Sequence, residues 1–247
     1  MAEILLPFDA TCIEGTFVQR YKRFSVEILA QGQSMWVHSN NSGSMLGLLQ
    51  RGNRVLVSLS SNPKRKMPGT LELIESRGSW VGVNTSVPLK LLQAAFKEGK
   101  LPFAAGYTDF KAETFVPQEL AACSATEKVR LDALISAVGK APIWVECKNV
   151  TLVEDEVAAF PDARTERGQK HLRALINLVQ NGQRAVCFYL VQRSDGHCFG
   201  PADYIDEKYA ELFWQAIEAG VEVYPFRAQI SRQGIGLGEL LPLVGRG

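Results

Sequence analysis

The first 85 residues carry the alternating hydrophobic and polar pattern of short β-strands, and no stretch among them has helical periodicity. Hydrophobic residues between positions 18 and 28 share one parity, which predicts a half-buried strand. Arg20 and Lys22 occupy that same parity, so we expect a bulge or bend there. Further strand-like runs, separated by glycine, asparagine and proline, lie at residues 34–38, 54–60, 70–76 and 80–83. About five short strands predict a small OB-like β-barrel over residues 1–85, although an SH3-like barrel or a small sandwich would give a similar pattern.

From residue 86 onward the pattern alternates between helical and strand periods. Helical spacing of hydrophobic residues predicts helices at residues 87–97, 162–180 and 206–219. Strand-like runs lie at residues 107–116, 129–135, 142–151, 184–191 and 221–226. The order α-β-β-β-α-β-α-β predicts a mixed α/β layered domain over residues 86–247. We expect the glycine cluster at residues 234–238, which follows the last predicted strand, to form a C-terminal turn.

The composition fits a folded protein without membrane segments. Hydrophobic residues make up 46% of the chain and charged residues 21%, which is enough for a packed core. No run approaches the roughly 18 apolar residues of a membrane helix, and the acidic residues near the start do not suit a secretory signal. The five cysteines are widely spaced and never form a Cys-x-x-Cys, so we expect reduced thiols and a cytoplasmic location.

The formal net charge of +1 conceals an uneven distribution along the chain. Residues 1–85 contain nine lysines and arginines against six acidic residues, whereas the remainder contains 18 against 20. The cations of the first part gather in two clusters that include Tyr21, which suits phosphate contact and base stacking. The candidate nucleic-acid-binding residues are Arg20, Tyr21, Lys22, Arg23, Lys64, Arg65 and Lys66. The alternative interpretation is two solvated loops beside aromatic residues of the core.

A carboxylate and an ammonium group occupy the same face of the apolar strand predicted at residues 142–151. Glu146 and Lys148 share one parity, and the hydrophobic residues between and before them share the other. Asp132 and Glu113 lie in the two preceding strands, and all three acids would converge if these strands are neighbours. Carboxylate oxygens with water are the ligands that Mg²⁺ prefers, and Mn²⁺ is its usual substitute. We therefore expect a metal site of Asp132, Glu146 and Glu113 beside Lys148, the arrangement of many metal-dependent nucleases.

The Asp/Glu-x-Lys tripeptide has little specificity, because it occurs four times in this chain. Only the copy at residues 146–148 lies in an apolar strand with an aspartate-bearing strand upstream and a long helix downstream. In that helix Gln169 could support the metal, and Arg164, Arg167, Lys170 and His171 could approach phosphates. The alternatives are a structural ion pair in the strand and a hydrated first half of the helix.

Motifs of other chemistries are absent from the sequence. It contains no Gly-x-Ser-x-Gly nucleophile elbow, no Walker loop and no Rossmann glycine run, so no organic cofactor is expected.

Taken together, these motifs resemble the bacterial sugar fermentation stimulation protein A family along nearly the whole chain. The matching stretches are residues 19–24 (QRYKRF), 41–45 (NSGSM), 62–66 (NPKRK), 130–132 (RLD), 145–152 (VECKNVTL), 160–163 (FPDA), 165–172 (TERGQKHL) and 205–209 (IDEKY). The resemblance implies an OB-type domain followed by a restriction-endonuclease-like domain of the PD-(D/E)xK fold. By motif match it implies nuclease-like positions for Asp132, Glu146 and Lys148, with Glu113 and Gln169 matched less closely.

The resemblance also implies largely non-specific DNA binding and a role in regulating sugar (maltose) metabolism. Two function classes follow: a DNA-binding regulatory factor, for which RNA is a further possible partner, and an active Mg²⁺-dependent nuclease that cleaves phosphodiester bonds. A sugar-metabolising enzyme is the weaker third class, because no sugar or cofactor motif is present. No membrane partner is expected, and the sequence does not determine the oligomeric state.

Overall fold

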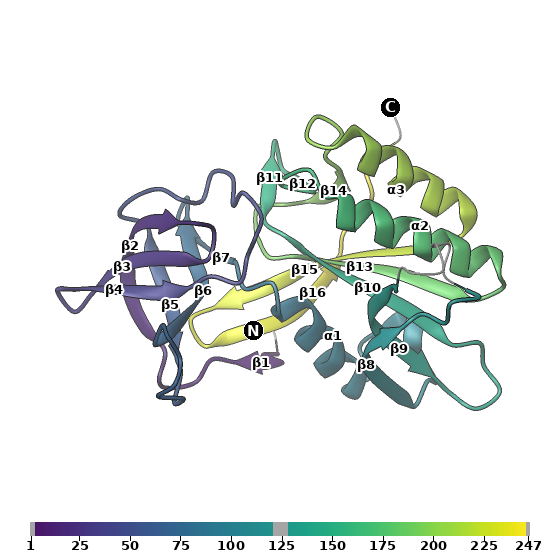
Figure 1. Ribbon diagram of the computed structural model, residues 1–247, viewed down its shortest axis with the longest axis horizontal. Helices are drawn as coiled ribbons and strands as arrows, with labels where there is room; N and C mark the ends of the chain where they lie inside the picture. Colours follow the sequence, from purple (N-terminus) through teal and green to yellow (C-terminus); the bar gives the residue numbers. More distant parts are fainter. Residues whose placement is uncertain (1–2, 121–127, 246–247) are drawn as a thin grey trace.

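The computed structural model describes residues 3–120 and 128–245 and has two lobes (Figure 1). The smaller lobe is a barrel, and the larger lobe is a sheet with helices on both faces. The prediction of a small barrel followed by a mixed α/β domain is confirmed. No helix of the described part of the chain is long and apolar enough to cross a membrane.

The barrel is formed by a six-stranded sheet in the order β4-β3-β2-β5-β6-β7, closed by a pairing between β4 and β6. Its strands are β2 (Ile13–Tyr21), β3 (Ser25–Ala30), β4 (Gln33–His38), β5 (Arg54–Leu59), β6 (Gly69–Ser76) and β7 (Ser79–Gly82). Alternate residues such as Val26, Ile28 and Val37 are fully buried in the barrel core. Burial of one face of each strand explains why most of these strands were predictable from their period.

The single strand predicted between residues 18 and 28 is wrong, because this segment forms the hairpin of β2 and β3. The chain reverses at Lys22 and Arg23, which both have positive φ angles (48° and 64°). The bend expected near Arg20 and Lys22 is therefore present, but as the turn of a hairpin. Left-handed backbone at lysine and arginine is uncommon, so the residue types did not indicate that the chain reverses completely.

The larger lobe is built on a seven-stranded sheet in the order β1-β16-β15-β13-β10-β9-β8. Its strands are β1 (Leu6–Pro7), β8 (Asp109–Phe115), β9 (Arg130–Ser136), β10 (Ile143–Val150), β13 (Arg184–Val191), β15 (Glu222–Ser231) and β16 (Gly234–Leu240). The predicted barrel range of 1–85 therefore needs a correction at its start, because β1 pairs with β16 of this second sheet. A separate three-stranded sheet consists of β11 (Leu152–Glu154), which follows directly after the central strand β10, β12 (Val157–Phe160) and β14 (Cys198–Pro201).

The C-terminal turn predicted at residues 234–238 is also wrong, because these residues belong to β16. Backbones approach so closely there that side chains would not fit. A Cβ atom on Gly236 would lie 2.4 Å from the Glu3 carbonyl oxygen, and one on Gly238 would lie 2.5 Å from that of Arg227. The glycines thus serve close packing within a sheet and not a turn.

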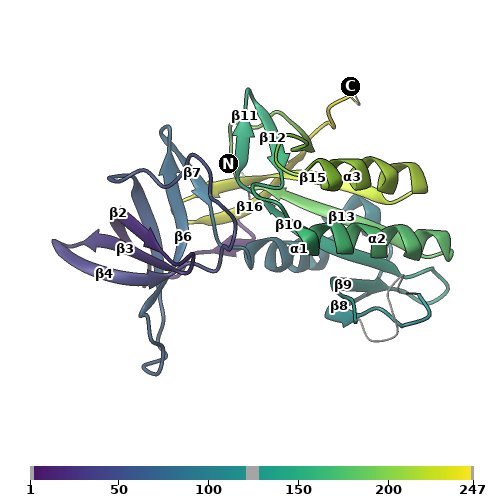
Figure 2. The same ribbon diagram turned by 45° about the horizontal axis from the view of Figure 1, so that its top comes forward.

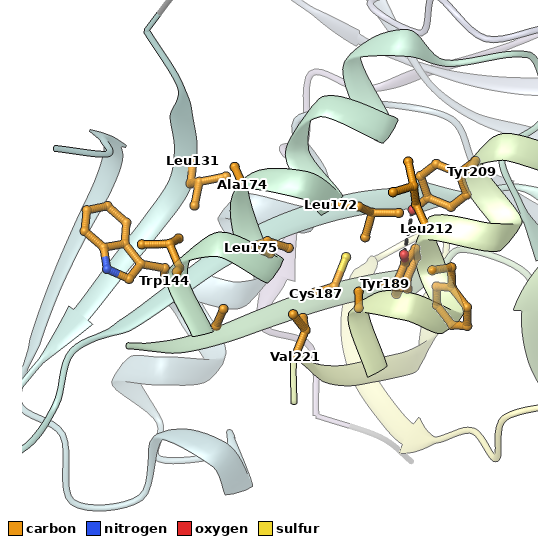
Figure 3. Packing of buried hydrophobic residues seen from close by; sticks show 14 of the residues in the cluster. Leu131, Trp144, Leu172, Ala174, Leu175, Cys187, Tyr189, Tyr209, Leu212 and Val221 are labelled. Atoms are coloured by element: carbon orange, nitrogen blue, oxygen red, sulfur yellow. Dashed lines mark hydrogen bonds between the residues drawn. The ribbon is translucent and has the colours of Figure 1, made fainter. Parts of the chain in front are cut away.

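Helices cover both faces of the large sheet (Figures 1 and 2). Helices α2 (Glu166–Gln180) and α3 (Glu207–Ala219) pack together on one face, and α1 (Val87–Lys97) packs on the other, followed by the short 3-10 helix η1 (Pro102–Ala104). Figure 3 shows the core beneath α2 and α3, which includes Leu172 and Leu175 of α2 and Cys187 and Tyr189 of β13. The Tyr189 and Tyr209 hydroxyls, 2.6 Å apart, hydrogen-bond each other inside this core.

Candidate functional site

Strand β10 presents Glu146 and Lys148 on the face that α2 covers, as the strand period predicts. The opposite residues of the strand, Ile143 and Val145, are buried against the α1 side. Strand β9 pairs with β10 only as far as the Ala133–Val145 partners. Beyond that point, Asp132 Oδ2 accepts a hydrogen bond of 2.7 Å from the Cys147 backbone N–H. The separation of the two strands thus places the Asp132 carboxylate beside Glu146.

Glu146, Lys148 and His171 form a buried polar cluster between β10 and α2. Glu146 is only 3% exposed, and its Oε1 lies 2.6 Å from Lys148 Nζ. His171 Nδ1 contacts the same Oε1 atom and lies 3.3 Å from Lys148 Nζ. The second oxygen, Oε2, is buried without any hydrogen-bond partner in the described structure. A buried carboxylate oxygen without a partner is costly, so its position favours a ligand that supplies positive charge.

The surroundings shift the pKa values of both acids in different directions. Burial and the neighbouring Glu146 charge raise the pKa of Asp132 to about 6, and the Cys147 N–H only partly offsets this. Burial would also raise the pKa of Glu146, but attraction to Lys148 and the bond with His171 outweigh it and lower that pKa. Lys148 is the counterpart, because attraction to Glu146 raises its pKa despite burial. Glu146 and Lys148 therefore stay charged at neutral pH, whereas Asp132 becomes protonated as the pH falls through about 6.

The donor set fits a hard divalent cation held through two carboxylates. Asp132 and the free Oε2 of Glu146 supply oxygen ligands, and Mg²⁺ commonly keeps several waters beside one or two carboxylates. Within residues 3–120 and 128–245, no group of three or more His, Cys, Asp and Glu side chains is arranged to hold a metal. Any metal site here therefore depends on these two acids and on water.

Glu113 does not reach the other two acids. It lies opposite Asp132 on β8 but has a positive φ of 51° and is left out of the strand pairing. Its exposed carboxylate lies 3.7 Å from an Arg130 guanidinium nitrogen. The predicted convergence of all three acids is thus wrong for Glu113, because the break in β8 turns it toward solvent.

Gln169 is also directed elsewhere. Its amide nitrogen donates to both carboxylate oxygens of Asp206, at 3.0 and 3.2 Å, and it does not line the cleft next to Glu146. Asp206 is the N-cap of α3, so Gln169 joins the starts of two helices. The sequence did not reveal this partner, which lies 37 residues further along the chain.

A cleft of about 600 Å³ opens over the acids, between the barrel and the larger lobe. Asp132, Glu146 and Lys148 form part of its floor. The barrel contributes the loop at residues 40–44, and the larger lobe contributes residues 160–165. Three exposed arginines also line the cleft: Arg23 from the β2–β3 turn, and Arg164 and Arg167 from the start of α2. Cations therefore surround the two carboxylates from both lobes.

Contacts between the lobes hold the barrel loop over this cleft. Asp162 Oδ2 accepts a 2.9 Å hydrogen bond from the Met45 N–H, and the Asp162 carbonyl accepts one of 2.6 Å from the Ser44 hydroxyl. Gly43 lies so close that a Cβ atom there would be 2.4 Å from Asp162 Oδ1. Sequence reasoning assigned no chemistry to residues 41–45 or 160–163. The only indication that residues 41–45 and 160–163 matter was that both stretches match motifs of the family that the sequence resembles.

Arg20 belongs to this framework and does not present a free cation. Its guanidinium donates to the backbone carbonyls of Arg23 (2.7 Å), Gly43 (2.9 Å) and Asn41 (2.5 Å). The prediction that Arg20 contacts nucleic acid directly is therefore not supported, because its donors are used to shape the loop. Arg23, in contrast, reaches the cleft.

The other predicted nucleic-acid-binding residues lie on the outside of the barrel. Tyr21 and Lys66 line a second, shallower hollow, and the Lys22 ammonium lies 5.2 Å from the centre of the Tyr21 ring. Lys64 is exposed in the loop between β5 and β6, and Arg65 donates to the Thr70 hydroxyl at 3.0 Å. None of these residues lines the cleft over the acids.

Comparisons with known proteins match both lobes. Residues 18–83 match the model of the SfsA N-terminal OB domain, and residues 86–234 match the sugar fermentation stimulation protein RE domain. A sugar fermentation stimulation protein homolog of Maridesulfovibrio salexigens is 50% identical over 98% of each chain, and one of Lawsonia intracellularis is 42% identical over 99% of each.

The fold also matches a solved structure, that of Pyrococcus furiosus SfsA in complex with Ca²⁺. The TM-score is 0.87 at 26% identity, covering 98% of this chain and 100% of the other. Both lobes, their order and nearly the full length are therefore shared with these relatives. The chain belongs to the sugar fermentation stimulation protein family, with an OB domain followed by a restriction-endonuclease-like domain.

Proposed function

We propose that the protein binds DNA, largely without sequence preference, in the cleft between its two lobes. The observation that carries this proposal is the position of Arg23, Arg164 and Arg167 around the cleft floor of Asp132 and Glu146. Arginines attract the phosphate backbone and carry little sequence information by themselves. The local positive charge explains how a chain of net charge +1 can bind a polyanion.

We further propose that DNA binding serves regulation of sugar metabolism, including that of maltose. The relatives share the description "sugar fermentation stimulation protein homolog", which supports this role. The cysteines at positions 12, 147, 187 and 198 are free thiols, which fits a cytoplasmic location, whereas Cys123 lies outside the described residues.

Anisotropy of fluorescein-labelled DNA, measured over a series of salt concentrations, tests this proposal. The logarithm of affinity should fall linearly with the logarithm of salt concentration, with a slope near 0.9 per phosphate contact for duplex DNA. Arg164→Ala combined with Arg167→Ala should weaken binding and reduce the slope by about 2. Arg173→Ala, an exposed arginine two turns along α2, is the matched control and should change neither quantity. Salt-independent binding would exclude phosphate contacts as the source of affinity.

Metal-dependent phosphodiester hydrolysis is the second candidate function, and the Glu146–Lys148 pair beside Asp132 favours it specifically. Glu146 and Asp132 would hold the cation, and the Ca²⁺ in the Pyrococcus relative supports a divalent metal in this family. When bound, Mg²⁺ or Mn²⁺ would polarise the phosphate and acidify a water molecule. Lys148 would keep its proton and stabilise negative charge on the phosphate, and the three cleft arginines would hold the flanking phosphates.

Purified protein incubated with labelled DNA and RNA in Mg²⁺ or Mn²⁺ tests hydrolysis. The expected result is cleavage that EDTA abolishes and that falls at least about 100-fold in Asp132→Ala and in Lys148→Ala. Circular dichroism of each variant separates loss of the site from loss of the fold. Cleavage that survives both substitutions would come from another site or a contaminant, and binding without cleavage would leave DNA binding as the function.

A further inference from the structure

The outer face of the barrel exposes three aromatic rings within one small area. Tyr21 is 55% exposed, Phe24 47% and Trp36 40%. Strand pairing explains their closeness, since Tyr21 lies opposite Ser25 on β3 and Ser25 lies opposite His38 on β4. The Phe24 ring stacks on the His38 ring with their centres 6.2 Å apart. Aromatic rings left in water at adjacent positions of a barrel indicate a binding surface more than a structural need.

Cations are interleaved with these rings. Tyr21, Trp36 and Lys66 line one hollow of about 270 Å³ with Ser25 and Met67. Lys22 lies over the edge of the same surface, next to the Tyr21 ring. We call this surface, formed by Tyr21, Lys22, Trp36 and Lys66, the aromatic face. Flat rings beside ammonium groups match a ligand with alternating bases and phosphates.

The backbone of the β2–β3 turn is strained at the residues that join the two surfaces. Lys22 and Arg23 both adopt positive φ angles, where glycine would be more stable by about 1 kcal/mol per residue. The turn places Tyr21 in the hollow of the aromatic face and Arg23 in the cleft over the acids. One short turn thus makes the aromatic face continuous with the proposed DNA cleft.

Glu27 marks the limit of this surface. It lies opposite Trp36, and hydrogen bonds from Ser34 (2.6 Å) and Gln19 (2.6 Å) hold its carboxylate. These bonds lower the pKa of Glu27, so it is ionised at neutral pH and repels phosphate. A nucleic-acid strand bound to the aromatic face would therefore run past Trp36 toward Arg23 and not across Glu27.

We propose that the aromatic face binds unpaired bases, so that the ligand of the cleft is single-stranded DNA. The inference rests on the proposed DNA-binding function and names the class of DNA. Bases in a duplex are stacked on one another and cannot lie on Tyr21 or Trp36, whereas the bases of a single strand can. The cleft arginines then hold the backbone of the same strand as it passes from the barrel to Asp132 and Glu146.

The test compares a 15-nucleotide oligo(dT), the same length of oligo(U) and a 15-base-pair duplex by fluorescence anisotropy. The wild-type protein should bind the single-stranded DNA most tightly. Tyr21→Ala and Trp36→Ala should each weaken that binding at least about fivefold and change duplex binding less than about twofold. Trp36→Phe keeps a ring and should retain most of the affinity. Phe115→Ala removes a 57% exposed ring on β8, at the opposite end of the molecule (Figure 1), and should change nothing.

The turn supplies a second test that does not depend on removing rings. Lys22→Gly and Arg23→Gly relieve left-handed backbone, so both variants should melt at or above the wild-type temperature. Both variants should nevertheless bind single-stranded DNA more weakly, because each loses a cation that would lie beside the bound DNA. If either variant keeps the affinity for single-stranded DNA and its salt dependence, the bound DNA does not pass along this turn.

The outcomes separate this inference from the function on which it rests. Salt-dependent duplex binding that equals single-strand binding, with no effect of either ring, would overturn the aromatic face and leave DNA binding intact. Failure to bind any of the three nucleic acids would overturn the proposed function itself. Tighter binding of oligo(U) than oligo(dT) would overturn the assignment to DNA.

Discussion

The two oxygens of Glu146 have opposite environments. Oε1 contacts both Lys148 and His171, whereas Oε2 is buried and has no hydrogen-bond partner among the residues that the structure describes. The Lys148 ammonium and the His171 ring both bind Oε1, so Glu146 keeps its negative charge inside the protein. Its second oxygen, Oε2, is left for a ligand. The same arrangement makes the fold depend on residues of the site.

Replacing Lys148 with methionine should destabilise the protein strongly. The buried Glu146 charge would keep only His171, and breaking a buried pair costs about 3–5 kcal/mol. Urea denaturation at pH 7.5 without divalent ions measures the effect. Lys208→Met breaks the exposed pair with Glu211, also 2.6 Å long, and should cost less than about 1 kcal/mol. Equal losses in the two variants would show that burial of the Glu146 pair has no energetic consequence.

Asp132 should make stability fall as the pH rises between about 4 and 6. Its pKa in the folded protein is about 6, against the ordinary value of 3.8 for an aspartate, so the folded protein binds more protons than the unfolded chain in that window. Above pH 6 the buried charge costs on the order of 2–3 kcal/mol. Asp132→Asn keeps an acceptor for the Cys147 N–H without the charge, and should therefore be more stable than wild type at pH 7.5.

The difference in free energy of unfolding between wild type and Asp132→Asn should be much smaller at pH 4 than at pH 7.5, because at pH 4 the folded protein keeps Asp132 protonated. Urea titrations at pH 4 and 7.5, in EDTA, provide the comparison. A difference that does not change with pH would mean that some effect other than the Asp132 charge separates the two proteins.

At the residue scale, local parity was enough to predict that Glu146 and Lys148 lie on one face of a buried strand. Glu146 and Lys148 share a face of β10 because a strand has a period of two, and Asp132 reaches them where the pairing of β9 with β10 ends and its carboxylate accepts from the Cys147 N–H. The same reasoning predicted that Glu113 would join these acids, and this was wrong, because Glu113 has a positive φ that turns its side chain away from Asp132 and Glu146. His171, predicted to approach phosphates, is buried on Glu146 through a contact between strand and helix that spacing alone does not reveal.

At the scale of elements, the starts of α2 and α3 are joined through one side chain. Thr165 caps α2 by accepting a 3.0 Å hydrogen bond from the Gly168 N–H. Asp206 caps α3 through the Tyr209 N–H at 3.0 Å, and it also accepts from the Thr165 N–H at 2.9 Å and from Gln169. Asp206 therefore fixes the segment that carries Arg164 and Arg167 along the cleft.

Asp206→Ala should consequently destabilise the protein more than Thr165→Ala. Loss of the Thr165 cap should cost about 1 kcal/mol, whereas loss of Asp206 leaves several donors unpaired and should cost about 2–3 kcal/mol. Asp206→Asn retains the acceptor oxygen and should lie between wild type and Asp206→Ala. Free energies of unfolding from urea titrations decide the order. Equal losses for Thr165→Ala and Asp206→Ala would show that Asp206 acts as a cap alone.

Elements with a strong period were predicted well, and those that depend on backbone proximity were not. The α1 range of residues 87–97 and the β13 range of residues 184–191 agree with the sequence prediction, because each buries a regular set of side chains. Strand β16 was missed, since its glycines allow neighbouring backbones to approach and leave no side-chain pattern. The β2–β3 hairpin was missed because Lys22 and Arg23 occupy a turn that usually contains glycine or asparagine.

At the scale of the whole molecule, the proposed function depends on how the barrel is held against the larger lobe. Asp162 binds the backbone at Met45 and the hydroxyl of Ser44, and Gly43 packs against its carboxylate. The charge distribution along the sequence predicted a basic barrel and an acidic second domain. It could not predict that the loop at residues 40–44 lies over the acids, because this contact joins residues more than 100 positions apart.

Substitutions at Gly43 and Asp162 should therefore be coupled. Asp162→Ala removes the acceptor for the Met45 N–H and should lower the melting temperature by about 4–8 °C, because a lost charged hydrogen bond costs about 1.5–3 kcal/mol. Gly43→Ala should also lower it, since the new Cβ would lie 2.4 and 2.6 Å from the two Asp162 carboxylate oxygens. In the Asp162→Ala background that clash is absent, so Gly43→Ala should have little further effect.

The control is Asp203→Ala, because the Asp203 carboxylate bonds only to the adjacent Tyr204 N–H among the bonds described. This substitution should leave the effect of Gly43→Ala unchanged. Strict additivity of the effects of Gly43→Ala and Asp162→Ala on the melting temperature would mean that the two residues do not act on one contact. If they are coupled, each single variant should also bind DNA more weakly, because the barrel loop and Arg23 would no longer be held beside Arg164 and Arg167.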